Sequence, residues 1–205
     1  MRINPFLDAF RFLTQPRWTT AVFWLLLIVS ALVAYDNGRR DPSQRSAVHV
    51  GTWLARFSIG AMWWGQTLWK VPPDFGGLRF WVGEIAKFAA FPWHQDFIRN
   101  IVLPHFSLFA PQVYLAEVLV AVSLILGLFS RLGAFVGLLM AVNLWLGLYR
   151  DPPEWPWTYG FLIIVQFLFL MYRPGRSLGL DAILLRRQTD TRAPAGRARL
   201  LRLLS

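Results

Sequence analysis

The sequence predicts an all-α integral membrane protein, and three observations support that prediction. Of the 205 residues, 56% are apolar, and the mean hydropathy of +0.42 is high for a soluble chain of this size. The apolar residues gather into five runs near the length that spans the hydrocarbon core of a bilayer. Tryptophan and tyrosine mark the ends of these runs, where amphipathic rings prefer the headgroup level.

The elements follow one another in a simple order. Residues 1–17 form an amphipathic tail, residues 18–35 the first predicted span, and residues 36–49 a basic linker. Four further spans are placed at residues 51–69, 112–129, 132–149 and 157–172. A basic, flexible tail is expected over residues 188–205. The sequence therefore predicts a four-helix bundle within residues 50–187, preceded by one extra transmembrane segment.

The connection over residues 70–111 is long, rich in aromatic residues and interrupted by prolines. Leu78, Trp81, Ile85 and Phe88 recur at helical spacing in its central part, with charged residues between them. A loop of this length and composition is unlike a simple linker. We expect two short interfacial helices that lie against the bundle.

Charge and cysteine content exclude several classes of protein. The net charge is +10, but the arginines lie between and beyond the apolar runs, so phospholipid headgroups are the expected partner and nucleic acid is not. The chain has no cysteine, which rules out thiolate metal sites and thioether-linked haem. The basic residues near the span ends predict a multi-pass protein with a cytoplasmic C-terminus.

Ionisable groups inside spans are costly and are therefore candidate sites. Arg56 lies in the second predicted span and Glu117 in the third. Because these two spans run in opposite directions, Glu117 is expected at the depth of Gln66 and Lys70, near the outer face. The sequence thus predicts an outer polar cluster of Glu117 with Lys70 or Gln66.

A second cluster is predicted near the inner face, where Arg56 comes to the depth of Arg131 and Asp181. We expect structural ion pairing among these residues, with Asp181 as the partner of Arg56. Three interpretations of the two clusters stay open: they fasten helices together, they line a pocket for a quinone headgroup or a proton path, or they bind lipid.

The remaining polar residues and small residues carry weaker signals. None of the three histidines falls inside a span, so no metal site or transmembrane haem is predicted, and His105 is only a candidate for the polar pocket. Asn143 lies inside a span, where an amide bonds to a neighbouring helix or contributes to the same pocket. A small-residue stripe for helix packing comprises Gly133, Gly137 and Ala141. No nucleotide-binding, zinc-protease or nucleophile-elbow motif is present, so no catalytic residue is assigned.

Several short motifs occur in a characteristic order. They are Leu54-Ala55-Arg56, the segment from Gly65 to Lys70, the segment from Ile101 to His105, Glu117, the segment from Gly127 to Arg131, and the segment from Gly175 to Asp181. This order resembles the DoxX/DoxD-like family of bacterial membrane proteins, which includes the small subunit of thiosulfate:quinone oxidoreductase. The resemblance implies a four-helix core in the bacterial cytoplasmic membrane. It also implies that the characteristic polar positions of the family are Arg56, Lys70, His105, Glu117, Arg131 and Asp181.

The function expected from this resemblance is that of an accessory subunit of a quinone-linked redox complex, with other membrane subunits as partners. Quinone is then a candidate ligand, lipid an expected one, and no covalently bound cofactor is expected. A purely structural or assembly subunit of a respiratory or photosynthetic complex is the alternative. A small transporter is disfavoured because the sequence lacks inverted repeats and broken spans.

Overall fold

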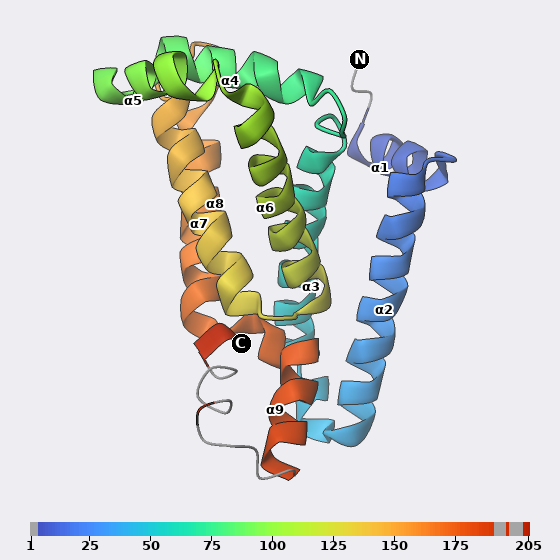
Figure 1. Ribbon diagram of the computed structural model, residues 1–205. Helices are drawn as coiled ribbons and strands as arrows, with labels where there is room; N and C mark the ends of the chain where they lie inside the picture. Colours follow the sequence, from blue (N-terminus) through green and yellow to red (C-terminus); the bar gives the residue numbers. More distant parts are fainter. Residues whose placement is uncertain (1–3, 191–195, 197–202) are drawn as a thin grey trace.

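The computed structural model describes residues 4–190, 196 and 203–205, and all regular structure in this part of the chain is helical. Five long helices run side by side, and two shorter ones lie across one end of them (Figure 1). The long helices are α2 (Trp18–Arg40), α3 (Ala47–Thr67), α6 (Phe106–Leu126), α7 (Ser130–Gly147) and α8 (Pro156–Tyr172). The others are α1 (Pro5–Thr14), α4 (Gly76–Phe88), α5 (Pro92–Phe97) and α9 (Leu180–Asp190), with 3-10 turns at Pro42–Arg45 and Pro174–Arg176 and a π turn at Ile98–Val102.

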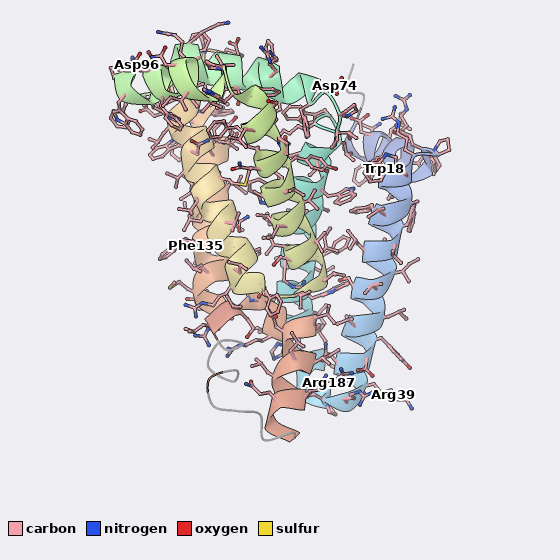
Figure 2. All side chains as sticks on the ribbon, in the orientation of Figure 1. Trp18, Arg39, Asp74, Asp96, Phe135 and Arg187 are labelled. Atoms are coloured by element: carbon pink, nitrogen blue, oxygen red, sulfur yellow. The ribbon has the colours of Figure 1, made fainter. Side chains whose placement is uncertain are left out.

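Three of the described helices, α2, α6 and α7, are long and apolar enough to cross a membrane, and α8 is equally apolar but has only 17 residues. Large apolar side chains on their outer faces remain exposed, such as Leu25, Leu115 and Phe161 at 60%, 63% and 64%. Phe135 of α7 also points away from the bundle (Figure 2). A soluble protein would cover such surface, whereas lipid tails solvate it. The chain is a membrane protein, as its composition predicts.

The two ends of the bundle differ in charge and are named here for what they carry. The arginine end holds the exposed Arg39, Arg40, Arg45 and Arg187, and the loop end holds residues 70–105 with α4 and α5. Figure 2 shows Arg39 and Arg187 at one end and Asp74 and Asp96 at the other. Exposed arginines are thus concentrated at one end of the bundle, and this is the kind of asymmetry that the positive-inside rule uses to assign orientation.

The bundle is assembled through successive neighbours: α3 packs along α6, α6 along α7, and α7 along α8. Close approach of α3 and α6 depends on Gly60, because a Cβ added there would lie 2.8 Å from the backbone nitrogen of Ile125. The core between these helices contains Trp63, Trp64 and Leu124. Gly65, in contrast, has no atom within 4 Å of an added Cβ and faces open space.

Helix α2 is attached to the bundle rather than detached from it. Its Phe23 ring packs against Phe12 of α1 and Phe57 of α3, with ring centroids 5.3 and 6.2 Å away. Ser30 Oγ of α2 donates a hydrogen bond to the Ile125 carbonyl of α6 at 2.7 Å and accepts one from Trp53 Nε1 at 3.1 Å. The extra N-terminal segment is therefore a fifth member of the helical assembly.

The long loop contains helices, as its periodicity predicts, but the buried face is slightly rotated. Leu78 and Ile85 of α4 are buried as expected, whereas Val82 rather than Trp81 completes the face. Helix α6 also begins six residues before the predicted start at residue 112, with Pro111 inside it. An interior proline removes one backbone hydrogen bond, and membrane helices tolerate this loss where neighbours surround them. The predicted flexible tail falls largely on residues 191–195 and 197–202, outside the described residues.

Candidate functional site

A buried ion pair joins α6 to the segment that follows α3. Lys70 lies three residues beyond the end of α3, and its Nζ donates to Oε1 of Glu117 in α6. The side chains of Lys70 and Glu117 are only 7% and 3% exposed. The Lys70 ammonium also lies over the Trp69 ring, 4.3 Å from its centroid, which supplies a second favourable contact for the cation. The structure thus brings together two of the residues predicted for the outer cluster.

The Glu117 carboxylate is incompletely satisfied. Its Oε2 atom is buried and has no hydrogen-bond partner among the described residues. A buried ion pair is weak evidence for stability, since desolvation offsets the attraction unless the remaining lone pairs are bonded. An unused carboxylate oxygen beside a buried ammonium is therefore a candidate binding feature.

Two indole groups add donors to the same part of α3. Trp63 and Trp64 are both 3% exposed, and the Nε1 of each has no hydrogen-bond partner in the described part of the chain. They precede Lys70 by about two helical turns on the helix that packs along α6. The interface of α3 and α6 therefore combines unused N–H donors with an unused carboxylate oxygen.

The other residues predicted for the pocket lie elsewhere. Gln66 is exposed on α3, and His105 is exposed at the start of α6, where its Nδ1 is 2.9 Å from the Ile101 carbonyl oxygen. Asn143 is exposed on α7 and interacts with His94 of α5. Lys70 and Glu117 therefore form the outer site without these three side chains.

His94 ties the helices at the loop end to α7. It is 5% exposed, its Nδ1 has no partner among the described residues, and its ring stacks on Trp93 with centroids 5.4 Å apart. Burial lowers the pKa of His94 below its ordinary value of 6.5, while the hydrogen bond with Asn143 acts in the opposite direction. The burial of His94 thus favours the neutral imidazole.

The inner cluster is built around the turn between α6 and α7. Arg56 is fully buried, and its Nη1 donates to the carbonyl oxygens of Leu124 and Ile125 at the end of α6. Gly127 ends that helix with φ +64°, and a Cβ added there would lie 2.7 Å from Arg56 Cζ. Only glycine combines this left-handed backbone with so close a neighbour.

Asp181 holds the other side of the same turn. Its carboxylate accepts hydrogen bonds from the backbone N–H groups of Phe129 and Ser130 at 2.7 and 3.0 Å, and from Ser130 Oγ at 2.7 Å. It therefore caps the N-terminus of α7 with a side chain more than 50 residues distant in sequence. Burial raises the pKa of Asp181, against the opposing effects of these hydrogen bonds and of the charge on Arg56.

The predicted inner ion pairing takes a different form. Arg56 and Asp181 lie within electrostatic reach of each other, but their hydrogen bonds go to the helix ends described above. Arg131 donates from Nε to the Leu170 carbonyl at 3.0 Å, near the end of α8. These contacts match the helix-fastening interpretation of the inner cluster.

Side chains of α2 and of the 3-10 turn that follows it bind the loop before α9. Asn37 of α2 donates from Nδ2 to the Gly179 carbonyl at 2.9 Å, and its Oδ1 accepts a hydrogen bond from Arg186. Gln44 Oε1 accepts from the Leu178 N–H at 2.8 Å. The loop before α9 is thus held by side chains from the start of the chain.

The small-residue stripe of α7 receives polar side chains from both neighbours. Gly133 faces Ser123 of α6, Gly137 faces Gln166 of α8, and Ala141 is fully buried one turn further on. Gln166 is 0% exposed, and neither its Nε2 nor its Oε1 has a partner among the described residues. Sequence reasoning missed Gln166, although an amide within an apolar run is the same signal that drew attention to Asn143.

Together, the fold and the site define a multi-pass helical membrane protein with a buried ion pair near its loop end. At its arginine end, Arg56 and Asp181 bind the two sides of the turn between α6 and α7. The described residues contain no group of three side chains suited to a metal ion. The chain belongs to the DoxD family: the family model described as "TQO small subunit DoxD" matches residues 79–196, more than half of the chain. This match confirms the resemblance seen in the sequence. Comparisons with curated proteins and with solved structures find no match.

Proposed function

We propose that this protein is an accessory membrane subunit of a thiosulfate:quinone oxidoreductase-type complex, and that Lys70 and Glu117 form the polar end of a quinone headgroup site. The family supports the first part of the proposal. The second part rests on one observation, the buried Glu117 carboxylate that has an unused oxygen beside a buried ammonium.

The chemistry of a quinone suits these two groups. A quinone carbonyl oxygen accepts hydrogen bonds, which Lys70 or an indole N–H can donate. A quinol hydroxyl donates, and Oε2 of Glu117 can accept from it. A single pair can thus serve both redox states of the headgroup, while the electrons come from a partner subunit that oxidises thiosulfate.

The difference in charge between the two ends of the bundle supports a proposed placement in the cell. We propose five spans in the bacterial cytoplasmic membrane, with the arginine end and the C-terminus facing the cytoplasm. The Lys70–Glu117 pair then lies in the outer half of the membrane. The partners are other membrane subunits of the redox complex, with phospholipids around the exposed apolar faces.

The alternative is a purely structural or assembly role, in which the pair only fastens the end of α3 to α6. Breaking a buried pair by removing one partner leaves an uncompensated charge and destabilises the fold for either function. A test must therefore remove both charges together and keep the volume. The double variant Lys70→Met/Glu117→Leu meets this requirement.

The test measures thiosulfate-dependent quinone reduction by the complex purified through a tag on this subunit. We expect the double variant to assemble normally and to reduce quinone at least 10-fold more slowly, with weaker quinone binding. Asp96→Asn is the matched control, since its exposed carboxylate forms a 3.9 Å ion pair with Arg99 at the same end of the bundle. Unchanged turnover in the fully assembled double variant would refute the headgroup site and leave the structural role.

A second measurement tests the subunit assignment itself. The tagged chain is purified in a mild detergent, and co-purifying proteins and extracted quinones are identified by mass spectrometry. We expect a sulfur-oxidising redox partner together with enriched quinone. Recovery of the chain alone or as a homo-oligomer would contradict the assignment to a larger complex.

A further inference from the structure

Helix α1 lies crosswise at the start of α2, at the loop end of the bundle (Figure 1). The two helices are separated only by residues 15–17, so the chain turns sharply between them. Neither the proposed quinone site nor the contacts at the arginine end involve α1. Its position and its exposed side chains therefore need an explanation of their own.

Side chains of α2 hold α1 in this crosswise position. Thr20 Oγ1 donates a hydrogen bond to the Phe12 carbonyl oxygen at 3.3 Å, and Trp24 Nε1 donates to the Leu13 carbonyl oxygen at 2.9 Å. Both carbonyl groups are among the last four of α1, which a helix cannot satisfy internally. The rings of Phe12 and Phe23 also meet edge to face, with centroids 5.3 Å apart. The angle between the two helices is thus set by specific contacts.

One side of α1 is apolar and faces the membrane-spanning part of the chain. Phe6, Phe10 and Leu13 recur at the i, i+4 and i+7 positions that share one side of a helix. Leu13 packs against the buried cluster that contains Phe23 and Leu26 of α2. Phe6 and Phe10, which continue the same side away from α2, are 86% and 62% exposed. Two large aromatic rings are therefore left without cover from this chain.

The position of α2 indicates what covers them. Helix α2 is one of the described helices that can cross a membrane, and it begins at Trp18, whose side chain is 59% exposed. An exposed tryptophan at the start of a span prefers the headgroup level. Figure 2 shows Trp18 where α1 meets α2. Helix α1 therefore lies at the membrane surface, and the lipid that surrounds α2 extends beneath Phe6 and Phe10.

The opposite side of α1 is polar. Asp8 and Arg11 point away from the apolar side at 100° per residue, and Arg11 is exposed. Arg17, in the turn before α2, is exposed as well. Guanidinium groups bind phosphate oxygens through charge-assisted hydrogen bonds, and lipid phosphates lie at this level of the membrane. The helix thus matches the two chemical layers of a leaflet surface.

We propose that α1 is an interfacial anchor whose binding partner is the phospholipid leaflet at the loop end. Phe6 and Phe10 enter the boundary between headgroups and acyl chains, and Arg11 and Arg17 meet the phosphates. Because α2 holds α1 rigidly, the anchor fixes the depth at which α2 enters the membrane. This inference is independent of the quinone site.

The test measures the depth of α1 in the full-length chain. The sequence has no cysteine, so Phe10→Cys, Asp8→Cys and Leu25→Cys each provide a single site for a spin label. The variants are placed in nanodiscs of phosphatidylcholine with phosphatidylglycerol, and collisions of the label with oxygen and with a water-soluble nickel chelate are measured by electron paramagnetic resonance. Leu25, which is 60% exposed on α2, is the reference for the acyl region.

We expect the ratio of oxygen to nickel collisions to be about 5-fold higher for the label at Phe10 than for the label at Asp8, and close to that at Leu25. Equal ratios at Phe10 and Asp8 would place the apolar side in water and overturn the anchor. A label at Phe10 that collides with neither reagent would show that protein covers this side, and it would assign the side to a protein partner instead.

A second variant tests the anchor without a label. Phe6→Ser/Phe10→Ser removes the two exposed rings but leaves the hydrogen bonds from Thr20 and Trp24 in place. A helix of 10 residues is marginal by itself, so we expect amide hydrogen exchange in α1 to become about 10-fold faster in the same nanodiscs. Asp8→Asn is the matched control on the polar side and should leave exchange unchanged. Wild-type protection in the double variant would overturn the proposal.

Discussion

Arg56 and Asp181 lie on opposite sides of the turn between α6 and α7, and each neutralises a different helix end. The Arg56 guanidinium bonds to the last carbonyl groups of α6, where the helix dipole is negative. The Asp181 carboxylate bonds to the first N–H groups of α7, where the dipole is positive. The two charges therefore hold one turn between them, and their mutual attraction adds to bonds that each already makes.

Asp181→Asn should weaken the hydrogen bonds that hold the turn between α6 and α7. The amide keeps one acceptor but loses the charge and at least one of three hydrogen bonds, so we expect the free energy of unfolding to fall by about 1–3 kcal/mol. Thermal unfolding of the detergent-purified chain measures the effect. Asp74→Asn, an exposed carboxylate at the other end, should leave the melting temperature unchanged; equal shifts in the two variants would argue against the capping role.

Gly127→Ala should destabilise the same turn by a different mechanism. A Cβ there would collide with the Arg56 guanidinium and would sit on a left-handed backbone, for which we expect a loss of about 1–2 kcal/mol or more. Gly65→Ala is the control within α3, because its added Cβ meets open space and replaces glycine in a helix interior. The melting temperature should fall for Gly127→Ala and stay level or rise for Gly65→Ala; the reverse order would be inconsistent with this geometry.

Substitutions of Lys70 and Glu117 should have non-additive effects on the free energy of unfolding. Lys70→Met alone leaves a buried carboxylate without its cation, so we expect a loss of about 3–5 kcal/mol. The double variant Lys70→Met/Glu117→Leu should be close to the wild type in stability, since it buries no charge. Unfolding measurements on the two singles and the double form a double-mutant cycle, and simple additivity would show that the two side chains do not interact.

The loop end should loosen as the pH falls. The pKa of His94 in the folded chain is below 6.5, so the unfolded chain binds the proton first and stability decreases as the pH drops from 6.5 towards the folded pKa. Limited proteolysis within residues 70–105 should therefore accelerate in this window. His94→Gln should remove that acceleration, and a variant that keeps it would assign the effect to other groups.

Asn37→Ala should show that the N-terminal segment is part of the folded unit. The change removes a buried donor to Gly179 and an acceptor for Arg186, so we expect a loss of about 1–3 kcal/mol. Arg39→Ala, an exposed neighbour on α2, is the control. Hydrogen exchange should increase in residues 174–182 of the Asn37 variant, and unchanged protection there would mean that α2 does not hold this loop.

The sequence predicts the helices well because their signals are local. Apolar runs bounded by aromatic residues identify the long helices, and the periodicity around Leu78 and Ile85 identifies α4. The predicted start of α6 at residue 112 is six residues too late, because the helix begins at Phe106 and continues through Pro111, which membrane helices tolerate where neighbours surround them. Because the second and third predicted spans run in opposite directions, the sequence predicts that Glu117 lies at the depth of Lys70. In the structure, the two side chains form an ion pair.

The rest of the site depends on where the helices end and which way their side chains face, which depth does not define. Gln66 and Lys70 are four residues apart and would share one face of a continuous helix, but α3 ends at Thr67, and Lys70 is buried against Glu117 while Gln66 is exposed. The partners of Asp181 are backbone N–H groups, which no sequence pattern displays. Gln166 becomes informative only when the contact with Gly137 shows that it faces the interior.

The contacts of Asn37 and Gln44 with Leu178 and Gly179 join the beginning of the chain to a segment made more than 130 residues later. During synthesis, the first helices enter the membrane while these side chains, and the N–H groups that Asp181 caps in α7, still lack their partners. The final arrangement of the arginine end therefore forms only after the loop before α9 has left the ribosome. A chain that stops short of that loop lacks these hydrogen bonds and leaves the polar groups of Asn37, Gln44 and the start of α7 without their partners.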